Sequence, residues 1–343
     1  MKAILFEEFC GPEKLKEKEF ADPKCGPHDV VVKIEACALN HLDIWVRQGI
    51  PGVKIEIPHV GGSDICGEII EIGKQVKGRR SGERVVVSPG IGCRVCEYCL
   101  AGKESLCDQY DIVGFRRNGG YAEKIAVDER DVIPVSERYS ASEWAAVPLV
   151  FLTAWHMLAT RARLQAGETV LIQAAGSGIG TAAIQIAKYL GANVITTAGS
   201  PEKLQKAKGL GVSNSINYRE NPYFSKAVLE ITGGRGADVV FEHIGGEVFS
   251  ESVAALAKEG RIVFCGATTS ETASFVLRQA YLRHLTFHGS FMGGRGELLH
   301  VLQLVEDKKI KPVLDSVFPL SQARQAQEKM LSRDFFGKIV LKV

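Results

Sequence analysis

The sequence predicts an α/β protein in which a doubly wound parallel sheet forms one domain and a β-rich fold forms the other. Three observations carry this prediction. Residues 1–149 contain short strand-like runs separated by glycine and proline. From about residue 150 the pattern changes to alternating strands and helices. Over residues 169–192 a strand, a glycine turn and a helix follow one another directly, which is how a doubly wound sheet begins.

Length and composition are those of a two-domain globular protein. The chain has 343 residues, of which 45% are hydrophobic and 24% charged, and its formal net charge is +2. A charge so close to zero gives no reason to expect a nucleic acid or a membrane surface as partner. The first 32 residues lack the apolar core of a signal peptide, and no apolar run could span a bilayer, so we expect a cytoplasmic protein. The nine cysteines would then be mostly reduced.

The first domain is predicted to consist of short strands and loops. Glycine and proline interrupt the strand-like runs, for example around Pro51. Two helix-like segments and a closing strand are expected to return to this domain, which gives it the bounds 1–149 and 291–343. The strand-like runs are residues 3–6, 30–35, 65–72 and 83–88, and the returning elements are residues 297–305, 321–331 and 337–342.

The second domain is expected over residues 150–290. Ser200 and Pro201 begin one of its helices, because serine is a good N-cap and proline fits the first helical position. Repeated strand–helix units imply a doubly wound parallel sheet. After the strand at residues 169–173, we expect strands at residues 193–198, 237–244, 261–266 and 285–290, with a helix at residues 247–257.

The glycine turn after residue 173 is the most informative local motif. The run at residues 169–173 suits a buried parallel strand, and apolar residues recur at helical spacing from Ile179 to Leu190. Small residues in the turn let a diphosphate approach the N–H groups at the helix start. The glycine order differs from GxGxxG, but the strand before it and the helix after it are the required context. We expect five residues to bind a dinucleotide: Gly176, Ser177, Gly178, Ile179 and Gly180.

Four cysteines lie within fifteen positions of the first domain. Cys93, Cys96, Cys99 and Cys107 are separated by two, two and seven residues. Four thiolates this close can complete a tetrahedral zinc site, which would be structural because it leaves no position for a substrate. An iron–sulfur cluster is the alternative, although its bacterial motif has a shorter last spacing followed by proline, where this chain has Asp108. Free reduced cysteines are a further alternative.

These features together resemble the medium-chain dehydrogenase/reductase superfamily, which includes zinc alcohol dehydrogenases and quinone oxidoreductases. The resemblance covers essentially the whole chain and implies a GroES-like catalytic domain joined to a Rossmann domain. The cysteine spacing resembles the alcohol dehydrogenases, and NGGYAE at Asn118 and PLVFLTAWHML at Pro148 resemble family landmarks. AAGSGIG, ALNHLDIWVRQG at Ala38 and TAGSPEK at Thr197 are closer to the quinone oxidoreductases. The family resemblance also implies a homodimer or homotetramer.

A catalytic zinc distinguishes the two branches. Alcohol dehydrogenases of this family hold it with a cysteine, the histidine of a GHE motif and a second cysteine or acid, and it stabilises an alkoxide as a Lewis acid. The resemblance places these ligands at Asn40, Ser63 and Leu149, which are poor zinc ligands. The proton-relay hydroxyl and the histidine that follows it become Leu42 and Trp45. We therefore expect only one zinc, held by the four cysteines in a structural-zinc lobe of about residues 90–112, hereafter the lobe.

A displaced zinc could in principle be held by Cys37, His59, Asp64 or Cys66. Both cysteines alternate within strand-like runs, where a free cysteine usually serves as a small buried hydrophobe. No three of the four residues fall at a recognised ligand spacing.

Without zinc, hydride transfer needs another means of polarising the acceptor. Reduction of a quinone, or of a double bond conjugated to a carbonyl, spreads charge over an enolate that hydrogen bonds can stabilise. Asn40 is the first candidate donor, with a capping or turn role as the alternative. Ser63 and Asp64 are candidates for a hydrogen-bonding or proton role. Trp45 is a candidate for an apolar pocket wall or for the core.

The cofactor is expected to be NADPH, with NADH as the alternative. NAD-specific enzymes place an acidic residue at the end of the second strand, where this chain has Ala198. Ser200 and Lys203 could hold a 2′-phosphate, although surface lysines are often only solvated. The resemblance adds a phosphate-contacting role for Tyr218, a diphosphate contact or a ligand-free loop position for His41, and nicotinamide contacts for Thr153, Cys265 and Gly266.

The sequence therefore predicts an NADPH-dependent reductase that acts on a quinone, a conjugated enone or an activated ketone. One alternative is a zinc alcohol dehydrogenase that acts on a secondary or aromatic alcohol. Another is an NADPH-binding structural or RNA-binding protein with little turnover, although the chain has no basic stripe.

Overall fold

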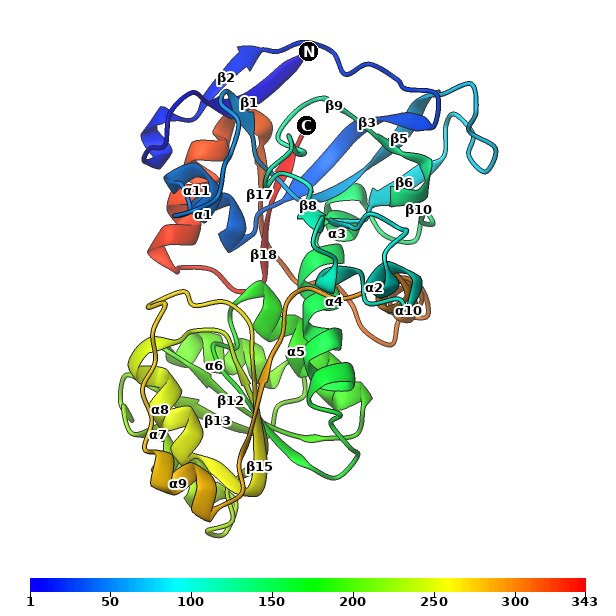
Figure 1. Cartoon of the computed structure of the whole chain (residues 1–343). Coiled ribbons are helices and arrows are strands. Elements are labelled where there is room, and N and C mark those ends of the chain that lie inside the picture. The colour runs from blue at the N-terminus through cyan, green and yellow to red at the C-terminus, as the bar shows by residue number, and fades with distance from the viewer. The chain divides into compact units, whose positions relative to one another are not determined.

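The computed structural model describes all residues from Met1 to Val343, and the chain divides into two compact units (Figure 1). The first unit comprises residues 1–149, 293–306 and 312–343, and the second comprises residues 150–292 and 307–311. The return to the first domain was predicted at residue 291, whereas the chain returns to the first unit at residue 293. None of the helices combines the length and the apolar composition that a bilayer span requires.

A seven-stranded sheet organises the first unit, with the order β10-β6-β5-β3-β18-β17 and with β9 paired to β3. The end of β3 lies between two other strands, because Ala38 is opposite Asp64 on one side and opposite Val340 on the other. The sheet therefore brings the beginnings of β5 and β18 to the residues that follow β3. The strands are β3 (Asp29–Ala38), β5 (Asp64–Ile72), β6 (Arg84–Val87), β9 (Lys124–Asp128), β10 (Val132–Pro134), β17 (Leu314–Pro319) and β18 (Lys338–Lys342).

Smaller sheets and several helices complete the first unit. Its core is a continuous apolar cluster that includes Ile34 of β3, Ile69 of β5 and Leu341 of β18. The smaller sheets are formed by β1 (Lys2–Phe6), β2 (Lys16–Glu19) and β4 (His59–Val60), and by β7 (Gly90–Ile91) and β8 (Asp111–Ile112). The helices are α1 (His41–Gln48), α2 (Glu97–Leu100), α3 (Ala141–Ala145), α10 (Arg295–Glu306) and α11 (Ala323–Ser332). Helix α4 (Pro148–Trp155) begins in the first unit and continues into the second.

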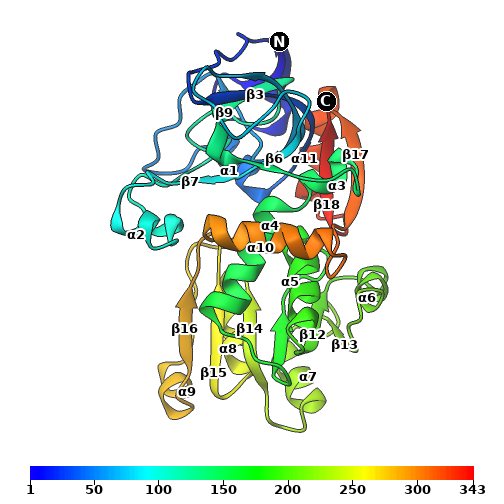
Figure 2. The ribbon, with the colours of Figure 1, turned by 90° about the vertical axis from the view of Figure 1, so that its right-hand side faces the viewer.

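The second unit contains a six-stranded sheet in the order β13-β12-β11-β14-β15-β16, and every neighbouring pair is parallel. Figure 2 shows these strands from β16 at one edge to β13 at the other. This order is that of a doubly wound fold, which confirms the predicted fold class. The strands are β11 (Thr169–Ile172), β12 (Asn193–Ala198), β13 (Asn214–Asn217), β14 (Ala237–Glu242), β15 (Leu256–Phe264) and β16 (Thr286–Gly289). The helices are α5 (Gly178–Tyr189), α6 (Pro201–Lys208), α7 (Phe224–Ile231), α8 (Gly246–Ala254) and α9 (Leu277–Leu282).

Several predicted boundaries in this unit were wrong. The strand expected over residues 237–244 ends at Glu242, and the strand expected to begin at residue 261 begins at Leu256. The helix expected to reach Ala257 ends at Ala254, because Leu256 and Ala257 are buried in the first part of β15. The strand expected to reach Gly266 ends at Phe264, so that Cys265 and Gly266 belong to the following loop, where Gly266 has a φ of +75°.

Candidate functional site

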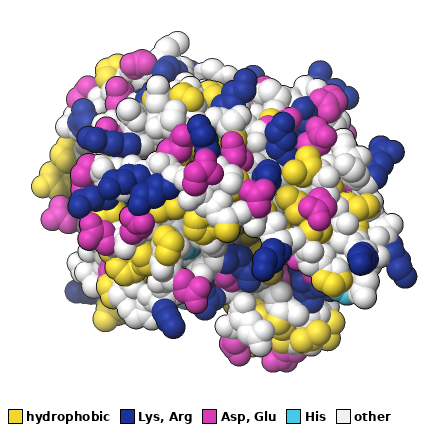
Figure 3. All heavy atoms as spheres, turned by 90° about the horizontal axis from the view of Figure 1, so that it is seen from above, with side chains coloured by type: hydrophobic (Ala, Val, Ile, Leu, Met, Phe, Trp, Pro, Cys, Tyr) yellow, Lys and Arg dark blue, Asp and Glu magenta, His cyan; other side chains and the backbone are white.

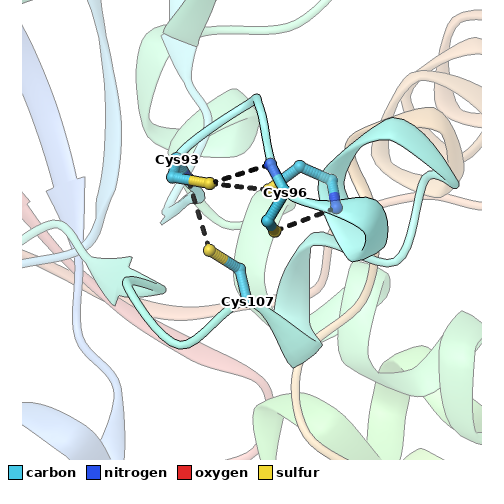
Figure 4. Close-up of side chains that lie close together, drawn as sticks. Cys93, Cys96 and Cys107 are labelled. Carbon is cyan, nitrogen blue, oxygen red and sulfur yellow. Dashed lines mark hydrogen bonds between the residues drawn. The ribbon is translucent and has the colours of Figure 1, made fainter.

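The four cysteines of the predicted zinc lobe lie together in the first unit. Their Sγ atoms all lie within 4.8 Å of one another, and those of Cys93 and Cys99 are 3.9 Å apart. Zinc–sulfur bonds of about 2.3 Å make the edge of a tetrahedral site about 3.8 Å long. Three of the cysteines are shown in Figure 4, which also shows that the Cys96 N–H donates to Cys93 Sγ. The donor set therefore fits a structural zinc.

The backbone around the four cysteines favours the thiolate of Cys93, whereas burial raises the pKa of the Cys99 thiol to about 12. N–H groups of Val95 and Cys96 lower the pKa of the Cys93 thiol to about 6. A Cβ added to Gly92 would lie 2.7 Å from Cys99 Sγ, so the loop has room only for glycine there. Arg94 has a positive φ of 70°, and its guanidinium donates to both carboxylate oxygens of Asp131 at 2.6 and 2.7 Å. This ion pair joins the lobe to the short turn that immediately precedes β10.

We expect the purified protein to contain one zinc per chain by elemental mass spectrometry. Cys96→Ser should lose that zinc and lower the melting temperature, because an oxygen replaces one of four sulfur ligands. Cys25→Ser is the matched control, since Cys25 is a free cysteine outside the lobe, and it should retain the metal. Retention of one zinc by the Cys96→Ser variant would contradict the assignment.

The positions expected for a catalytic zinc surround a buried ion pair instead. Lys338 Nζ donates to Leu39 O at 2.7 Å, to Asn40 Oδ1 at 2.7 Å and to Asp64 Oδ2 at 2.9 Å. The Asn40 amide donates to the same Asp64 oxygen at 2.9 Å. The other Asp64 oxygen accepts the Leu149 N–H at 2.8 Å. Asn40, Asp64 and Lys338, hereafter the buried triad, are 6%, 0% and 4% exposed.

Strand pairing brings the three residues of the triad together, and the start of a helix adds a further contact. Asp64 begins β5 and Lys338 begins β18, and both strands flank the end of β3, which leads into Asn40. Leu149 is in the first turn of α4, where backbone N–H groups have no partner within the helix. Asp64 supplies the missing acceptor.

The residues at this position do not fit a catalytic zinc. An ammonium group contacts both Asn40 and Asp64, and Leu149 contributes only its backbone N–H. A set of three or more Cys, His, Asp or Glu side chains close enough to share an ion occurs only in the lobe.

The residues considered as ligands of a displaced zinc are buried in the core or have other contacts. Cys37 and Cys66 are fully buried, and burial raises the pKa of each thiol. This burial confirms their prediction as small core residues. His59 is buried, and its Nε2 lies 3.1 Å from Gly114 O.

The structure changes the interpretation of Asp64. The catalytic roles expected of Ser63 and Asn40 stay predictions. Asp64 is fully buried with both oxygens bonded, which fits an organising role and not proton transfer to a substrate. Ser63 is fully buried, and its hydroxyl has no hydrogen-bond partner. Asn40 is the N-cap of α1, as one alternative predicted, but its side-chain amide bonds to Asp64 and Lys338.

A second buried carboxylate lies beside the triad. Asp43 accepts from the Asn40 N–H at 2.7 Å, the Tyr121 hydroxyl at 2.8 Å and the Gly62 N–H at 3.1 Å. Tyr121 belongs to the NGGYAE motif, so this landmark serves to hold Asp43. Burial raises the pKa of Asp43 to about 6, against the opposing effect of these hydrogen bonds.

The raised pKa of Asp43 predicts a stability that falls with pH. The folded chain holds the Asp43 proton up to about pH 6, whereas the unfolded chain loses it near 3.8. The resulting stabilisation is complete below the lower value and is lost as pH rises through the higher one. Between pH 4.5 and 7.5 the wild type should lose about 2 kcal/mol relative to Asp43→Asn, measured by urea unfolding. Parallel pH curves for the two proteins would contradict this assignment.

His41 and Trp45 lie one turn apart on α1. Their ring centroids are 4.8 Å apart in an edge-to-face arrangement, and both side chains are half-buried. Burial, and secondarily the charge of Arg333, lower the pKa of His41. A neutral imidazole at pH 7 would offer a diphosphate a hydrogen bond but no charge.

The predicted dinucleotide turn forms the start of α5 in the second unit. The Ser177 hydroxyl accepts from the Gly180 N–H at 2.9 Å and donates to Ala174 O at 2.9 Å. A Cβ on Gly180 would lie 2.3 Å from Ala174 O, so the helix needs glycine to start this close to the strand. The N–H groups of Gly178 and Ile179 lie in the first turn, where anions bind. The local geometry fits a diphosphate.

Three residues predicted near the adenosine ribose are brought together. Ser200 is the N-cap of α6, and its hydroxyl accepts from the Lys203 N–H at 3.3 Å. A Cβ on Gly199 would lie 2.5 Å from the Tyr218 hydroxyl. The Tyr218 ring therefore reaches the end of β12, immediately before the capping serine.

The predicted nicotinamide contacts have different neighbours within the second unit. The Thr153 hydroxyl lies 3.8 Å from the sulfur of Met292. The Cys265 N–H donates to Glu242 O at 3.2 Å, and burial raises the pKa of the Cys265 thiol to about 12. This thiol is therefore protonated at neutral pH.

One unit has a parallel sheet and a helix start whose geometry fits an anion, and the other has a cluster of four thiols. Together they are typical of a two-domain dinucleotide oxidoreductase. Two family models match: the alcohol dehydrogenase GroES-like domain over residues 26–137 and the zinc-binding dehydrogenase domain over residues 178–307. The chain belongs to the medium-chain dehydrogenase/reductase superfamily and is an NAD(P)-dependent oxidoreductase.

Relatives from both branches of the superfamily are similar over most of the chain. An NAD-dependent alcohol dehydrogenase of Sulfolobus acidocaldarius is 32% identical, with 100% of each chain covered. Quinone oxidoreductase-like protein 2 of Bos taurus is 30% identical over 92% of this chain and 85% of that protein. A crystal structure of an NAD-dependent alcohol dehydrogenase shares 42% identity and a TM-score of 0.97, with both chains fully covered.

Proposed function

We propose that this protein is an NADPH-dependent reductase of quinones, conjugated enones or activated ketones that works without a catalytic zinc. The buried triad carries the proposal. It places an ammonium–carboxylate pair at Asn40 and Leu149, two of the positions expected for zinc ligands. A metal-independent reaction then has to stabilise the oxyanion by hydrogen bonds.

Conjugate reduction suits such a site. Hydride addition to the β-carbon moves an electron pair onto the carbonyl oxygen and gives an enolate, and a proton then completes the saturated ketone while NADPH becomes NADP⁺. The Asn40 amide has two N–H bonds, of which one is directed to Asp64. The second N–H is our proposed donor to the enolate oxygen.

The surroundings of Ser200 support NADPH. No acidic residue follows β12 directly, and the Ser200 hydroxyl, the Lys203 ammonium and the Tyr218 hydroxyl are the proposed contacts for the 2′-phosphate. The relatives named as NAD-dependent make NADH the alternative. They also favour, as a second candidate function, an alcohol dehydrogenase that interconverts a secondary or aromatic alcohol and its ketone.

The third candidate, an NADPH-binding protein with little turnover, has less support. On the face shown in Figure 3, basic and acidic side chains are interspersed, without the basic stripe expected for RNA binding. Measurable multiple-turnover oxidation of NADPH would exclude an inert protein.

We further propose a homodimer or homotetramer. Large apolar side chains are exposed on and beside α9, next to the edge strand β16, and such patches often mark contacts between chains. They are Val276, Leu277, Tyr281 and Leu282.

Product analysis tests the proposed reaction. The protein, with its zinc content measured, is incubated with 2-cyclohexenone and either NADPH or NADH. The proposal expects cyclohexanone, a preference for NADPH and one zinc per chain. Formation of the allylic alcohol, or a second zinc whose removal abolishes turnover, would overturn it in favour of the alcohol dehydrogenase.

A further inference from the structure

We propose that Lys338 is a positioning residue for Asn40: its buried ammonium fixes the Asn40 amide and strengthens it as a donor to the substrate oxyanion. This inference rests on the proposed function. Lys338 lies 298 residues from Asn40 along the chain, at the start of the last strand.

Charge determines the orientation of the amide. An ammonium can only donate and an ionised carboxylate can only accept. Lys338 therefore selects the amide oxygen, and Asp64 selects the amide nitrogen. A rotation that exchanged the oxygen and nitrogen of Asn40 would oppose N–H to N–H on one side and oxygen to oxygen on the other.

The same contacts increase the donor strength of Asn40. A cation bonded to Oδ1 draws electron density from the amide and leaves the Nδ2 hydrogens more positive. Hydrogen bonds in a chain polarise one another, and the effect is larger where water is excluded, as at these buried side chains. The positive charge thus acts on the oxyanion through Asn40, although Lys338 itself does not contact the substrate.

A purely architectural role is the competing explanation. Asp64 also accepts the first-turn N–H of Leu149, so the pair could serve only to hold the start of α4. The two explanations differ in whether the effect of Lys338 depends on Asn40.

A double-mutant cycle separates the explanations. The first change is Asn40→Ala. The second is Lys338→Met with Asp64→Asn, which removes both charges and leaves no unpaired buried ion. Steady-state reduction of 2-cyclohexenone by the zinc-loaded variants is followed with saturating NADPH, and thermal melts check folding. Lys342→Met is the control, because Lys342 is exposed on the same strand.

We expect Asn40→Ala to lower kcat about 100-fold, in the range measured for the loss of one oxyanion donor. The variant that combines Lys338→Met with Asp64→Asn, hereafter the pair variant, should lower kcat about 10-fold or more and leave the KM for NADPH within about 2-fold. Adding the pair variant to Asn40→Ala should lower kcat no further. If the pair variant fails to fold, Lys338→Met alone or Lys338→Arg alone enters the cycle. Because arginine retains the charge, Lys338→Arg should keep a higher kcat than Lys338→Met.

The outcomes separate this inference from the proposed function. If Asn40→Ala lowers kcat and the pair variant does not, or if the two losses multiply, Lys338 does not act through Asn40 and the inference fails alone. If Asn40→Ala leaves enone reduction unchanged, Asn40 is not the donor and the inference fails, although the protein is still an enone reductase. If the wild type forms no cyclohexanone from 2-cyclohexenone and NADPH, the proposed function fails and the inference fails with it.

Discussion

Replacing Asp64 by alanine should lower the free energy of unfolding by about 3–5 kcal/mol. The substitution leaves the Lys338 ammonium 4% exposed without its counter-charge, and it removes the acceptor of the Leu149 N–H. A buried charge without a partner is among the few single changes with an effect this large. Urea unfolding at pH 7, followed by tryptophan fluorescence, measures the change.

Two controls identify the charge as the cause. The double variant Asp64→Asn with Lys338→Met removes both charges and should be closer to the wild type than Asp64→Ala is. Glu202→Ala breaks the ion pair between Glu202 and Lys206, whose side chains are 75% and 51% exposed, respectively. Because this pair is on the surface, its loss should lower the free energy of unfolding by less than about 0.5 kcal/mol. A loss below about 1 kcal/mol for Asp64→Ala would contradict the importance of the pair.

Ser200→Asp should reduce kcat/KM for NADPH about 30- to 150-fold and leave NADH nearly unaffected. The new carboxylate would stand where we propose the 2′-phosphate, and like charges at close range cost about 2–3 kcal/mol. Aspartate caps a helix as well as serine does, so α6 should remain intact. Initial rates with each cofactor and a fixed enone concentration measure the ratio.

Ser200→Asn is the matched control, because asparagine has nearly the same size as aspartate, carries no charge and is an equally good N-cap. It should retain most of the preference for NADPH. If both variants lose NADPH activity equally, the cause is the shape of the cap and not its charge. If neither changes the cofactor ratio, the phosphate lies elsewhere.

Local patterns predicted those elements that are apolar or sharply capped. Strand β12 was predicted with its observed bounds, because its buried residues form one uninterrupted run and Ser200 follows as a cap. Strand β13 was missed, because its residues NSIN are mostly polar and it occupies an edge of the sheet. A polar edge strand carries no hydrophobic period by which a sequence could reveal it.

The zinc lobe and the triad show the same contrast at the level of sites. All four thiols come from fifteen consecutive positions, so their spacing was enough to propose the metal. Lys338 was missed. Its only local signal is a lysine after a glycine at the start of an apolar strand, and its partner Asp64 lies 274 residues away in the chain.

The sequence could predict features that depend on contacts within one turn or one loop: four thiolates suited to zinc, a glycine turn expected to bind a diphosphate, and a serine at a helix start. The sequence also showed poor zinc ligands at Asn40, Ser63 and Leu149, but it did not show that an ion pair lies beside them. That depended on the sheet, which sets β18 beside the end of β3 and so buries an ammonium against Asn40 and Asp64. Burial turns a lysine that would otherwise be solvated into a fixed charge, and burial is a property of the folded chain alone.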